Sequence, residues 1–504
     1  MLLSIAACGG DSDNTLTTRK YAYGESVPDG DKTATKGFRV GYGRTEIMPK
    51  DSVPLASYGN ALQRMSTGFL NMIYFTCIAI TDEEDNTLLL MTHDLTQSSA
   101  DILEELRQYA KNKYGVDPNY VHLSGTHTHS SVSIGSQVKS VTDYKVKYYQ
   151  RAHEAIDMAM ADRKTATLYA GETKTEGLNF VRNYYRADGT CAGDNYGYLS
   201  SSPVVAHVKE PDETMRLIKF CRTNSDGEKV KDVVLMNWQA HNHMTGSSTN
   251  TDLAADFSGS CREYMESQKD CYFAFFQGCA GNLNETDTFF PQNNRTTDYR
   301  EYGKLLAGYA LDVYDKLEKM DTGLVKSETK DFVGPAIHRY DYLYSAAKEV
   351  LALYTASGNS LDAILPLCKQ YGIQGNHHAS CIIKNYSTAK TVTMPVNVYC
   401  IGNSIGFATG PVEFFDVLGQ QMRAGSPFKV TFTQGYTDQY LGSYMPSADA
   451  YDYGCYEAYN TKFEQGAGEM CAAQLIEMLK EIALAELFKD YRPPEIDELI
   501  EKYG

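Results

Sequence analysis

The chain has 504 residues, and its 47 Lys and Arg residues against 64 Asp and Glu residues give a formal net charge of −17. Hydrophobic residues make up 42% of the chain and charged residues 22%, a globular composition that excludes a disordered or fibrous protein. The acidic balance argues against nucleic acid as a partner, because binding a polyanion requires a basic surface that displaces counterions.

The N-terminus resembles a bacterial lipoprotein signal. Residues 1–8 form a short apolar run that ends in Cys8, and residues 9–36 are a polar mixture that indicates a linker. The run is shorter than the roughly 7–15 residues of a working signal and follows no basic segment, so either the true start lies upstream of Met1 or the resemblance is accidental. We predict an exported protein, either secreted or anchored to the membrane only through a lipid on Cys8. A cytosolic protein with a frayed N-terminus is the alternative.

Apolar runs alternate with helical patterns from residue 37 onward. A helix predicted at 98–114, followed by Gly115, separates strands predicted at 87–92 and 120–124. This strand–helix–strand unit favours a sheet with helical crossovers. Further strands are predicted at 74–81, 233–238, 271–276, 392–401 and 404–408, and further helices at 144–162, 254–268, 298–319, 412–423 and 470–487.

The predicted fold class is α/β, with one large domain over residues 37–504. We expect mixed sheets joined by helical crossovers, with a metal site at the strand ends. Residues 340–385 are less regular and indicate an inserted helical hairpin with a turn at His377 and His378.

Two pairs of histidines follow predicted strands. His127 and His129 come directly after the strand at 120–124, and His241 and His243 follow the strand at 233–238. Residues two apart in an extended segment point to the same face, so each pair would project two imidazoles together. Imidazole nitrogens are common zinc ligands, although either pair taken alone is also compatible with polar loop histidines.

Six groups of segments, in consistent order, are similar to known motifs. They lie at 41–49 with 53–55, 123–130, 237–241 with 255–259, 277–282, 391–398 with 410–413, and 444–447 with 456–457 and 466–469. Together they resemble the N-terminal catalytic domain of the neutral/alkaline non-lysosomal ceramidase family. The resemblance implies a zinc-dependent amidohydrolase of sphingolipid metabolism. Its substrate would be ceramide or a related N-acyl lipid, and a zinc-bound water would attack the amide.

The family's functional residues are carried over position by position. The implied zinc ligands are His127, His241, Glu413 and Tyr444. The implied catalytic residues are His129, Tyr456 and Arg182, with His129 as the proton shuttle. Tyr440 and Tyr451 are rivals for the tyrosine ligand. Asp256 would orient the ligating rings or, alternatively, serve as an acid at a helix N-terminus.

The chain departs from the family pattern at several places. Val412 stands before Glu413 where glycine is usual, which would reshape the ligand loop if the position required a positive φ. His243 is an additional histidine that could compete for the metal. We also expect no C-terminal β-sandwich domain after residue 504.

Two other functions remain open. Residues 402–406 match the G-x-S-x-G pattern of a serine esterase that would use Ser404, but a strand rather than a helix is predicted to follow, which favours a hairpin turn. The second alternative is a non-catalytic surface lipoprotein that binds lipid or glycan.

Overall fold

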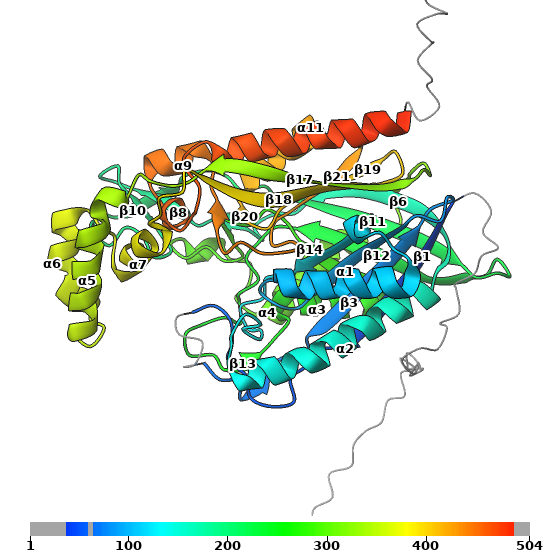
Figure 1. The fold of residues 1–504 in the computed structure, drawn as a ribbon, viewed down its shortest axis with the longest axis horizontal. Coiled ribbons are helices and arrows are strands. Elements are labelled where there is room, and N and C mark those ends of the chain that lie inside the picture. The colour runs from blue at the N-terminus through cyan, green and yellow to red at the C-terminus, as the bar shows by residue number, and fades with distance from the viewer. Residues whose placement is uncertain (1–36, 59–63, 488–504) are drawn as a thin grey trace, which may run out of the picture.

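The computed structural model describes residues 37–58 and 64–487 (Figure 1). The predicted signal at 1–8 and the predicted linker at 9–36 lie outside these ranges, so both stay predictions. None of the helices in the described ranges combines the length and apolar character that crossing a bilayer requires.

Two sheets form the centre of the molecule. The larger has the order β14-β12-β11-β6-β1-β3-β4-β5, with β16 beside β6, and the smaller has the order β17-β18-β19-β21. The larger sheet contains β1 (Phe38–Glu46), β3 (Tyr74–Thr81), β4 (Thr87–His93), β5 (Val121–Gly125), β6 (Lys164–Lys174), β11 (Thr214–Thr223), β12 (Lys229–Trp238), β14 (Cys271–Gln277) and β16 (Glu318–Lys319). The smaller contains β17 (Val325–Pro335), β18 (Thr391–Ile401), β19 (Ile405–Thr409) and β21 (Val430–Gln434).

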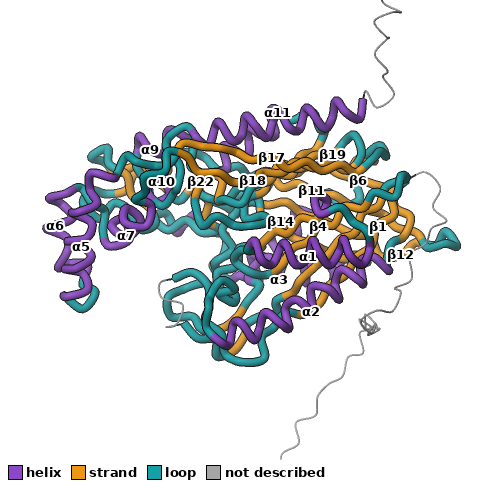
Figure 2. The backbone as a smooth tube through the Cα atoms, in the orientation of Figure 1, coloured by secondary structure: helices purple, strands orange, loops and turns teal. Residues whose placement is uncertain are grey.

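Helices cover the outer faces of both sheets, which gives four layers (Figures 1 and 2). The larger sheet is covered by α1 (Ala100–Tyr114), α2 (Lys139–Ala161), α3 (Asp256–Gln268) and α4 (Tyr299–Val313). The smaller sheet is covered by α8 (Asp416–Gly425) and α11 (Ala467–Leu487). The two sheets share a core between them, to which Ile78, Leu235, Phe407 and Phe432 contribute.

The short elements lie mostly in the connections. They are β2 (Gly68–Phe69), β7 (Phe180–Val181), β8 (Asn183–Arg186), β9 (Cys191–Gly193), β10 (Val204–His207), β13 (Asp252–Leu253), β15 (Leu283–Asn284), β20 (Glu413–Phe414), β22 (Tyr444–Met445), α9 (Ala448–Tyr453) and α10 (Tyr456–Tyr459).

Strand β3 illustrates why the central strands are nearly all apolar. Ile78 and Ile80 point into the core between the sheets, whereas Phe75, Cys77 and Ala79 point towards α1 and α2. Successive side chains of a strand alternate between faces, and here both faces are buried. A continuous apolar run is therefore the pattern that this position in the fold requires.

The predicted α/β class with helical crossovers is confirmed. Parallel strand pairs are joined through a helix in β4–α1–β5, β12–α3–β14 and β19–α8–β21. Helix α1 ends at Gly115, whose φ of 71° is in the left-handed region that glycine adopts without strain. The larger sheet also curls, so that Thr92 Oγ1 of β4 donates to the Phe275 carbonyl of β14 at 3.0 Å.

Several predicted boundaries are wrong. The helix predicted at 298–319 ends at Val313, and its last two residues form β16, which pairs with β6. The helix predicted at 412–423 begins only at Asp416, because residues 413–414 form β20, which pairs with β22. In both cases pairing with a distant strand overrides the local helical pattern.

Residues 340–385 form three helices rather than a hairpin. These are α5 (Tyr344–Ala356), α6 (Leu361–Tyr371) and α7 (Asn376–Asn385), which share a small core of their own. The predicted turn at His377 and His378 is wrong, because both residues lie in the first turn of α7. His378 Nδ1 accepts a hydrogen bond from the Gln374 amide at 3.1 Å, which stabilises the start of the helix.

Candidate metal centre

The two histidine segments lie side by side where β5 and β12 end. A parallel bridge joins Thr128 to Asn242, and the His129 amide donates to the Asn242 carbonyl at 3.0 Å. The curled sheet makes this possible, because it brings the ends of strands that are far apart in the sheet order together. The histidines therefore meet at strand ends, as predicted.

The local conformation is not the extended one that the sequence suggests. His127 has a φ of 61°, in the left-handed region that a residue with a Cβ rarely adopts. Such conformations persist where the surrounding structure enforces them, and they cluster at functional sites. Here the His127 amide donates to the Leu95 carbonyl at 3.1 Å. Because of this turn, the rings of His127 and His129 converge. The two imidazoles project together as predicted, but a left-handed turn and not an extended backbone brings them together.

His127 and His241 are held with their Nε2 atoms facing a common point. His127 Nδ1 lies 2.8 Å from the Thr96 carbonyl, and His241 Nδ1 lies 2.9 Å from the Ala280 carbonyl. A carbonyl only accepts, so each Nδ1 carries the proton and each Nε2 offers a lone pair. Burial lowers the pKa of both imidazoles, which keeps them neutral. These are the protonation and orientation that a metal ligand requires.

Glu413 completes a group of three potential ligands. Its Oε2 lies 3.5 Å from His127 Nε2 and 3.3 Å from His241 Nε2. Donor atoms bound tetrahedrally to one ion at about 2.0–2.1 Å lie roughly 3.3 Å apart, so the spacing and the buried N and O donors fit zinc. Tyr436 donates to Glu413 Oε2 at 3.4 Å, and Tyr440 donates to Glu413 Oε1.

The tyrosine positions differ sharply in their surroundings. Tyr444 lies opposite Glu413 in the β20–β22 pair, and its hydroxyl accepts from Arg182 Nη2 at 3.0 Å. Tyr451 donates instead to the Phe463 carbonyl at 2.8 Å within the hydrophobic core, so it is no longer a rival. Tyr440 remains a rival because its hydroxyl contacts Glu413 directly. Burial raises the pKa of both Tyr444 and Tyr440, so both hydroxyls keep their proton when no metal is bound.

His129 lies close enough to be either a ligand or a proton carrier. Its Nε2 is 3.1 Å from His127 Nε2, and the ligand atoms of His127, His129 and His241 lie within 4.8 Å of one another. Burial lowers the pKa of His129 well below its ordinary value. His243 is engaged differently, because its Nδ1 lies 2.9 Å from Glu285 Oε1.

Arg182 is buried behind the tyrosines and is held by several acceptors. Its Nε donates to Glu457 at 2.6 Å, its Nη1 to Asn284 at 3.3 Å and its Nη2 to the Gly281 carbonyl at 2.8 Å. The guanidinium also lies over the ring of Tyr456 at 5.8 Å. Glu457 lies within one of the matched segments, but no sequence pattern predicts its contact with Arg182.

All seven predicted site residues are brought to one region of the fold. Six of them line a cavity of about 1360 Å³, and His241 is buried directly beside it through its contacts with Glu413 and Arg182. Wall residues from other parts of the chain include Tyr58, Ser133, Asp194 and Asn284. Helix α7 adds His377 and Lys384, which the sequence does not connect with the site.

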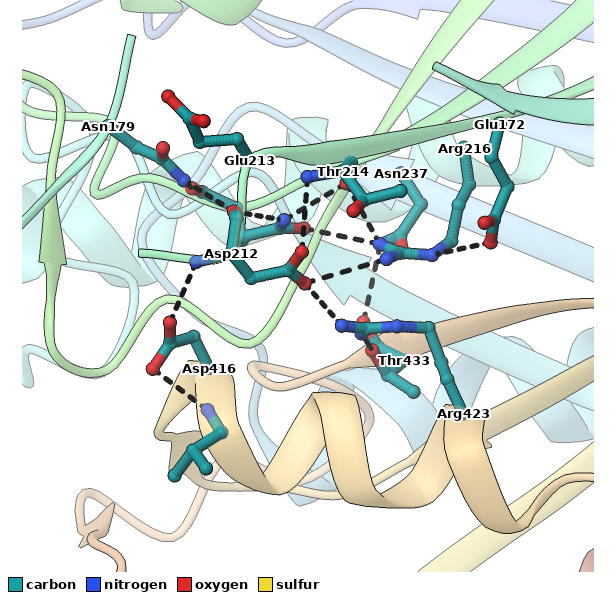
Figure 3. A network of polar contacts seen from close by, with 12 residues as sticks. Glu172, Asn179, Asp212, Glu213, Thr214, Arg216, Asn237, Asp416, Arg423 and Thr433 are labelled. Atoms are coloured by element: carbon teal, nitrogen blue, oxygen red, sulfur yellow. Dashed lines mark hydrogen bonds and ion pairs between the residues drawn. The ribbon is translucent and has the colours of Figure 1, made fainter. Parts of the chain in front are cut away.

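A buried polar network links segments that neighbour the residues of the metal centre in the sequence (Figure 3). Asp416, at the start of α8, accepts from the Asp212 amide at 2.9 Å. The Asp212 carboxylate pairs with Arg423, and its carbonyl accepts from Asn179 at 2.8 Å. Asn282 donates to Asp416 at 2.8 Å. The network thus joins the loops that carry Arg182, Gly281 and Glu413.

The prediction that Asp256 orients the ligating histidine rings is wrong. Its carboxylate accepts from the Thr245 amide at 2.7 Å and from the Phe257 amide at 2.6 Å. It is the first residue of α3, so the alternative of a helix N-terminal acid is confirmed. Burial raises its pKa to about 6. Backbone carbonyls orient the ligating rings instead, and sequence patterns do not reveal carbonyl positions.

Val412 and Ser404 both have ordinary structural surroundings. Val412 is buried, and it is not among the described residues with a positive φ, so this valine needs no glycine-like conformation. Ser404 lies in the hairpin between β18 and β19, where Gly402 takes a φ of 61°. Strand β19 follows directly, so the strand–turn–helix context of a nucleophile elbow is absent at this described hairpin.

Comparison with family models and with curated proteins found no match. Among solved structures, the chain is similar to neutral ceramidase from Pseudomonas aeruginosa, with 17% sequence identity and a TM-score of 0.65 over 89% of this chain and 75% of that one. A structure of ceramidase complexed with C2 is similar at 17% identity and a TM-score of 0.64, over the same shares. The chain therefore has the fold of neutral ceramidase, which confirms the predicted resemblance at the level of the fold.

Proposed function

We propose that the protein is a zinc-dependent amidohydrolase that cleaves the N-acyl bond of ceramide or a related N-acyl lipid. The proposal rests on one observation. At the wall of a large cavity, Glu413 Oε2 lies 3.5 Å from His127 Nε2 and 3.3 Å from His241 Nε2. The fold shared with neutral ceramidase supports the substrate class. Tyr444 is the proposed fourth ligand.

The bound metal would polarise the amide carbonyl and lower the pKa of water, the two changes that amide hydrolysis needs. Water adds to the carbonyl carbon, the C–N bond breaks, and the products are a fatty acid and a free amine. His129 is placed to accept the proton from the attacking water and to pass it to the leaving nitrogen, since burial lowers its pKa and leaves the imidazole neutral at the start.

Tyr456 is the proposed donor to the carbonyl oxygen as negative charge develops there. Its hydroxyl accepts from Asn460 at 2.7 Å, which leaves its own proton free to donate into the cavity. Arg182 was predicted as a catalytic residue that binds substrate. Because its three nitrogens already donate to protein acceptors, we assign it a positioning role that fixes Tyr444 and the Gly281 loop.

Export and a lipid anchor at Cys8 are part of the proposal. The lipid-like substrate is compatible with a protein held at a membrane surface. Mass spectrometry of the protein purified from its native membranes would detect the acyl groups, and an unmodified N-terminus would contradict the anchor.

The proposed function is tested by metal analysis beside hydrolysis of a fluorescent ceramide. We expect one zinc per chain, loss of hydrolysis after chelation, and recovery when zinc is restored. Full activity in the zinc-free protein would contradict the zinc mechanism. Stoichiometric zinc without turnover of any N-acyl substrate would instead support the non-catalytic binding protein.

A further inference from the structure

Helix α7 presents one face to the cavity of the metal centre. His377 and Lys384 both line the cavity, and Cys381 lies between them at helical spacing. The His377 ring lies 5.1 Å from the Tyr456 ring, and Cys381 Sγ lies 3.4 Å from Asn460 Oδ1. The α7 wall therefore packs directly against Tyr456, and Lys384 lies further along the same wall.

Lys384 is a cation without an acidic partner. Its side chain is exposed, and within the described ranges no ion pair or hydrogen bond joins it to another residue. The half-buried Lys462 likewise has no ion pair among the described residues. Burial and the neighbouring charge of Lys384 lower the pKa of Lys462. The two lysines lie on neighbouring segments, because Asn385, which follows Lys384, donates to the carbonyl of Thr461, which precedes Lys462, at 2.7 Å.

The acids of the cavity wall are already engaged by other groups. Asp194 accepts from Asn284 at 3.3 Å and lies 3.6 Å from Arg182, whereas Glu413 is surrounded by two imidazoles and two tyrosine hydroxyls. Neither carboxylate contacts Lys384. An anion bound at Lys384 would not compete with the metal centre.

We propose that Lys384, supported by Lys462, binds an anionic group on the substrate, so that the preferred substrates are N-acyl amines bearing a carboxylate, sulfonate or phosphate. This inference rests on the proposed function for the identity of the cavity, and it narrows the substrate class from N-acyl lipids in general to anionic ones. The cleaved amide lies at the metal centre and the anion lies beyond Tyr456, along α7.

The test measures binding of uncleavable analogues to the zinc-loaded protein. Alkanesulfonamides of ω-aminoalkanesulfonates, with a short and a long spacer, are compared with the sulfonamides of the matching amino alcohols. The two members of each pair differ only in the terminal group, an anionic sulfonate or a neutral hydroxyl, and a sulfonamide offers no acyl carbon to attack. Titration calorimetry of each pair gives the ratio of the two dissociation constants.

We expect the wild type to bind at least one sulfonate about tenfold more tightly than its alcohol, the size of one charge-assisted contact. Lys384→Gln should abolish this preference, Lys384→Glu should reverse it, and Lys462→Gln should weaken it. Lys369→Gln on α6 is the matched control, because Lys369 is exposed and does not line the cavity. It should keep the wild-type ratio.

An equal ratio in wild type and Lys384→Gln would overturn the proposal. Replacing sodium chloride with sodium sulfate at constant ionic strength should leave the preference intact, and its loss would mean that the position binds free anions rather than substrate. A preserved sulfonate preference in a protein that hydrolyses no N-acyl amide would refute the proposed function while leaving the anion site standing. The two failures are therefore distinguishable.

Discussion

Gly281 offers a direct test of whether the position of Glu413 controls the metal centre. A Cβ at residue 281 would lie 2.5 Å from the Glu413 carbonyl oxygen and 2.9 Å from the Phe414 carbonyl oxygen. Both obstacles are backbone atoms of β20, and the first is 0.9 Å inside the 3.4 Å at which ordinary contact begins. The Gly281 carbonyl also accepts from Arg182. Gly281→Ala must therefore displace β20, Arg182 or both.

The expected cost is larger for metal binding than for folding. Overpacking of a well-packed interior costs about 1–3 kcal/mol of unfolding free energy. Displacing a ligand by several tenths of an ångström should weaken zinc binding by about 10–100-fold, as loss of a partner that orients a ligand does. Turnover of the zinc-saturated variant should fall by about 100-fold, because the reacting groups are misplaced.

The assays are zinc competition against a chelator, thermal unfolding and ceramide hydrolysis at saturating zinc. Gly308→Ala is the matched control, because Gly308 lies in α4 and a Cβ there meets nothing within 4 Å. That change should stabilise the protein by about 0.5–1 kcal/mol and leave zinc affinity unchanged. Wild-type zinc affinity and turnover in Gly281→Ala would refute the reasoning.

Four further outcomes are expected. His127→Ala and Glu413→Ala should lose zinc and hydrolysis together, as shown by metal analysis of the purified variants. His129→Ala should keep zinc and lose turnover by about 10²–10⁴-fold, and loss of zinc would make His129 a ligand rather than a proton carrier. Ser404→Ala should keep full hydrolytic activity, whereas inactivation would revive the serine esterase. Burial lowers the pKa of His93 to about 3, so the unfolded chain binds a proton that the folded chain does not. The free energy of unfolding should therefore fall as pH drops from about 6.5 towards 3, by at most about 1.4 kcal/mol per pH unit. Chemical denaturation across this range should show that the free energy of unfolding of His93→Gln depends less steeply on pH than that of the wild type. An unchanged pH dependence would contradict the low pKa of His93.

Strongly patterned segments could be predicted from the sequence because their cause is local. Strand β3 matches its predicted bounds, since both of its faces are buried and every position is apolar or small. Strands β6 and β17 escaped prediction because neither forms a continuous apolar run. Buried positions alternate with partly exposed ones along β6, and most positions of β17 are partly exposed. Their pairing with β1 and β18 depends on the sheets and not on local composition.

The candidate site likewise combines features that the sequence predicts with features that it does not. Placement of His127 and His241 directly after apolar strands is a property of the sequence. Their convergence depends on the curl of the larger sheet, which brings the distant strands β5 and β12 together. The carbonyls of Thr96 and Ala280, which fix the tautomers, come from other segments and carry no sequence signal. The same is true of the contact between Arg182 and Glu457, which are 275 residues apart.

Tertiary structure alone decided which side chains face the cavity and which serve as scaffold. Asp256 and Tyr451 had suitable chemistry, but one begins α3 and the other lies in the core. Lys384 had no motif around it, yet the packing of α7 against Tyr456 places it on the cavity wall. Residue type sets what a group can do chemically, whereas its neighbours in space set its protonation, its orientation and its access to substrate.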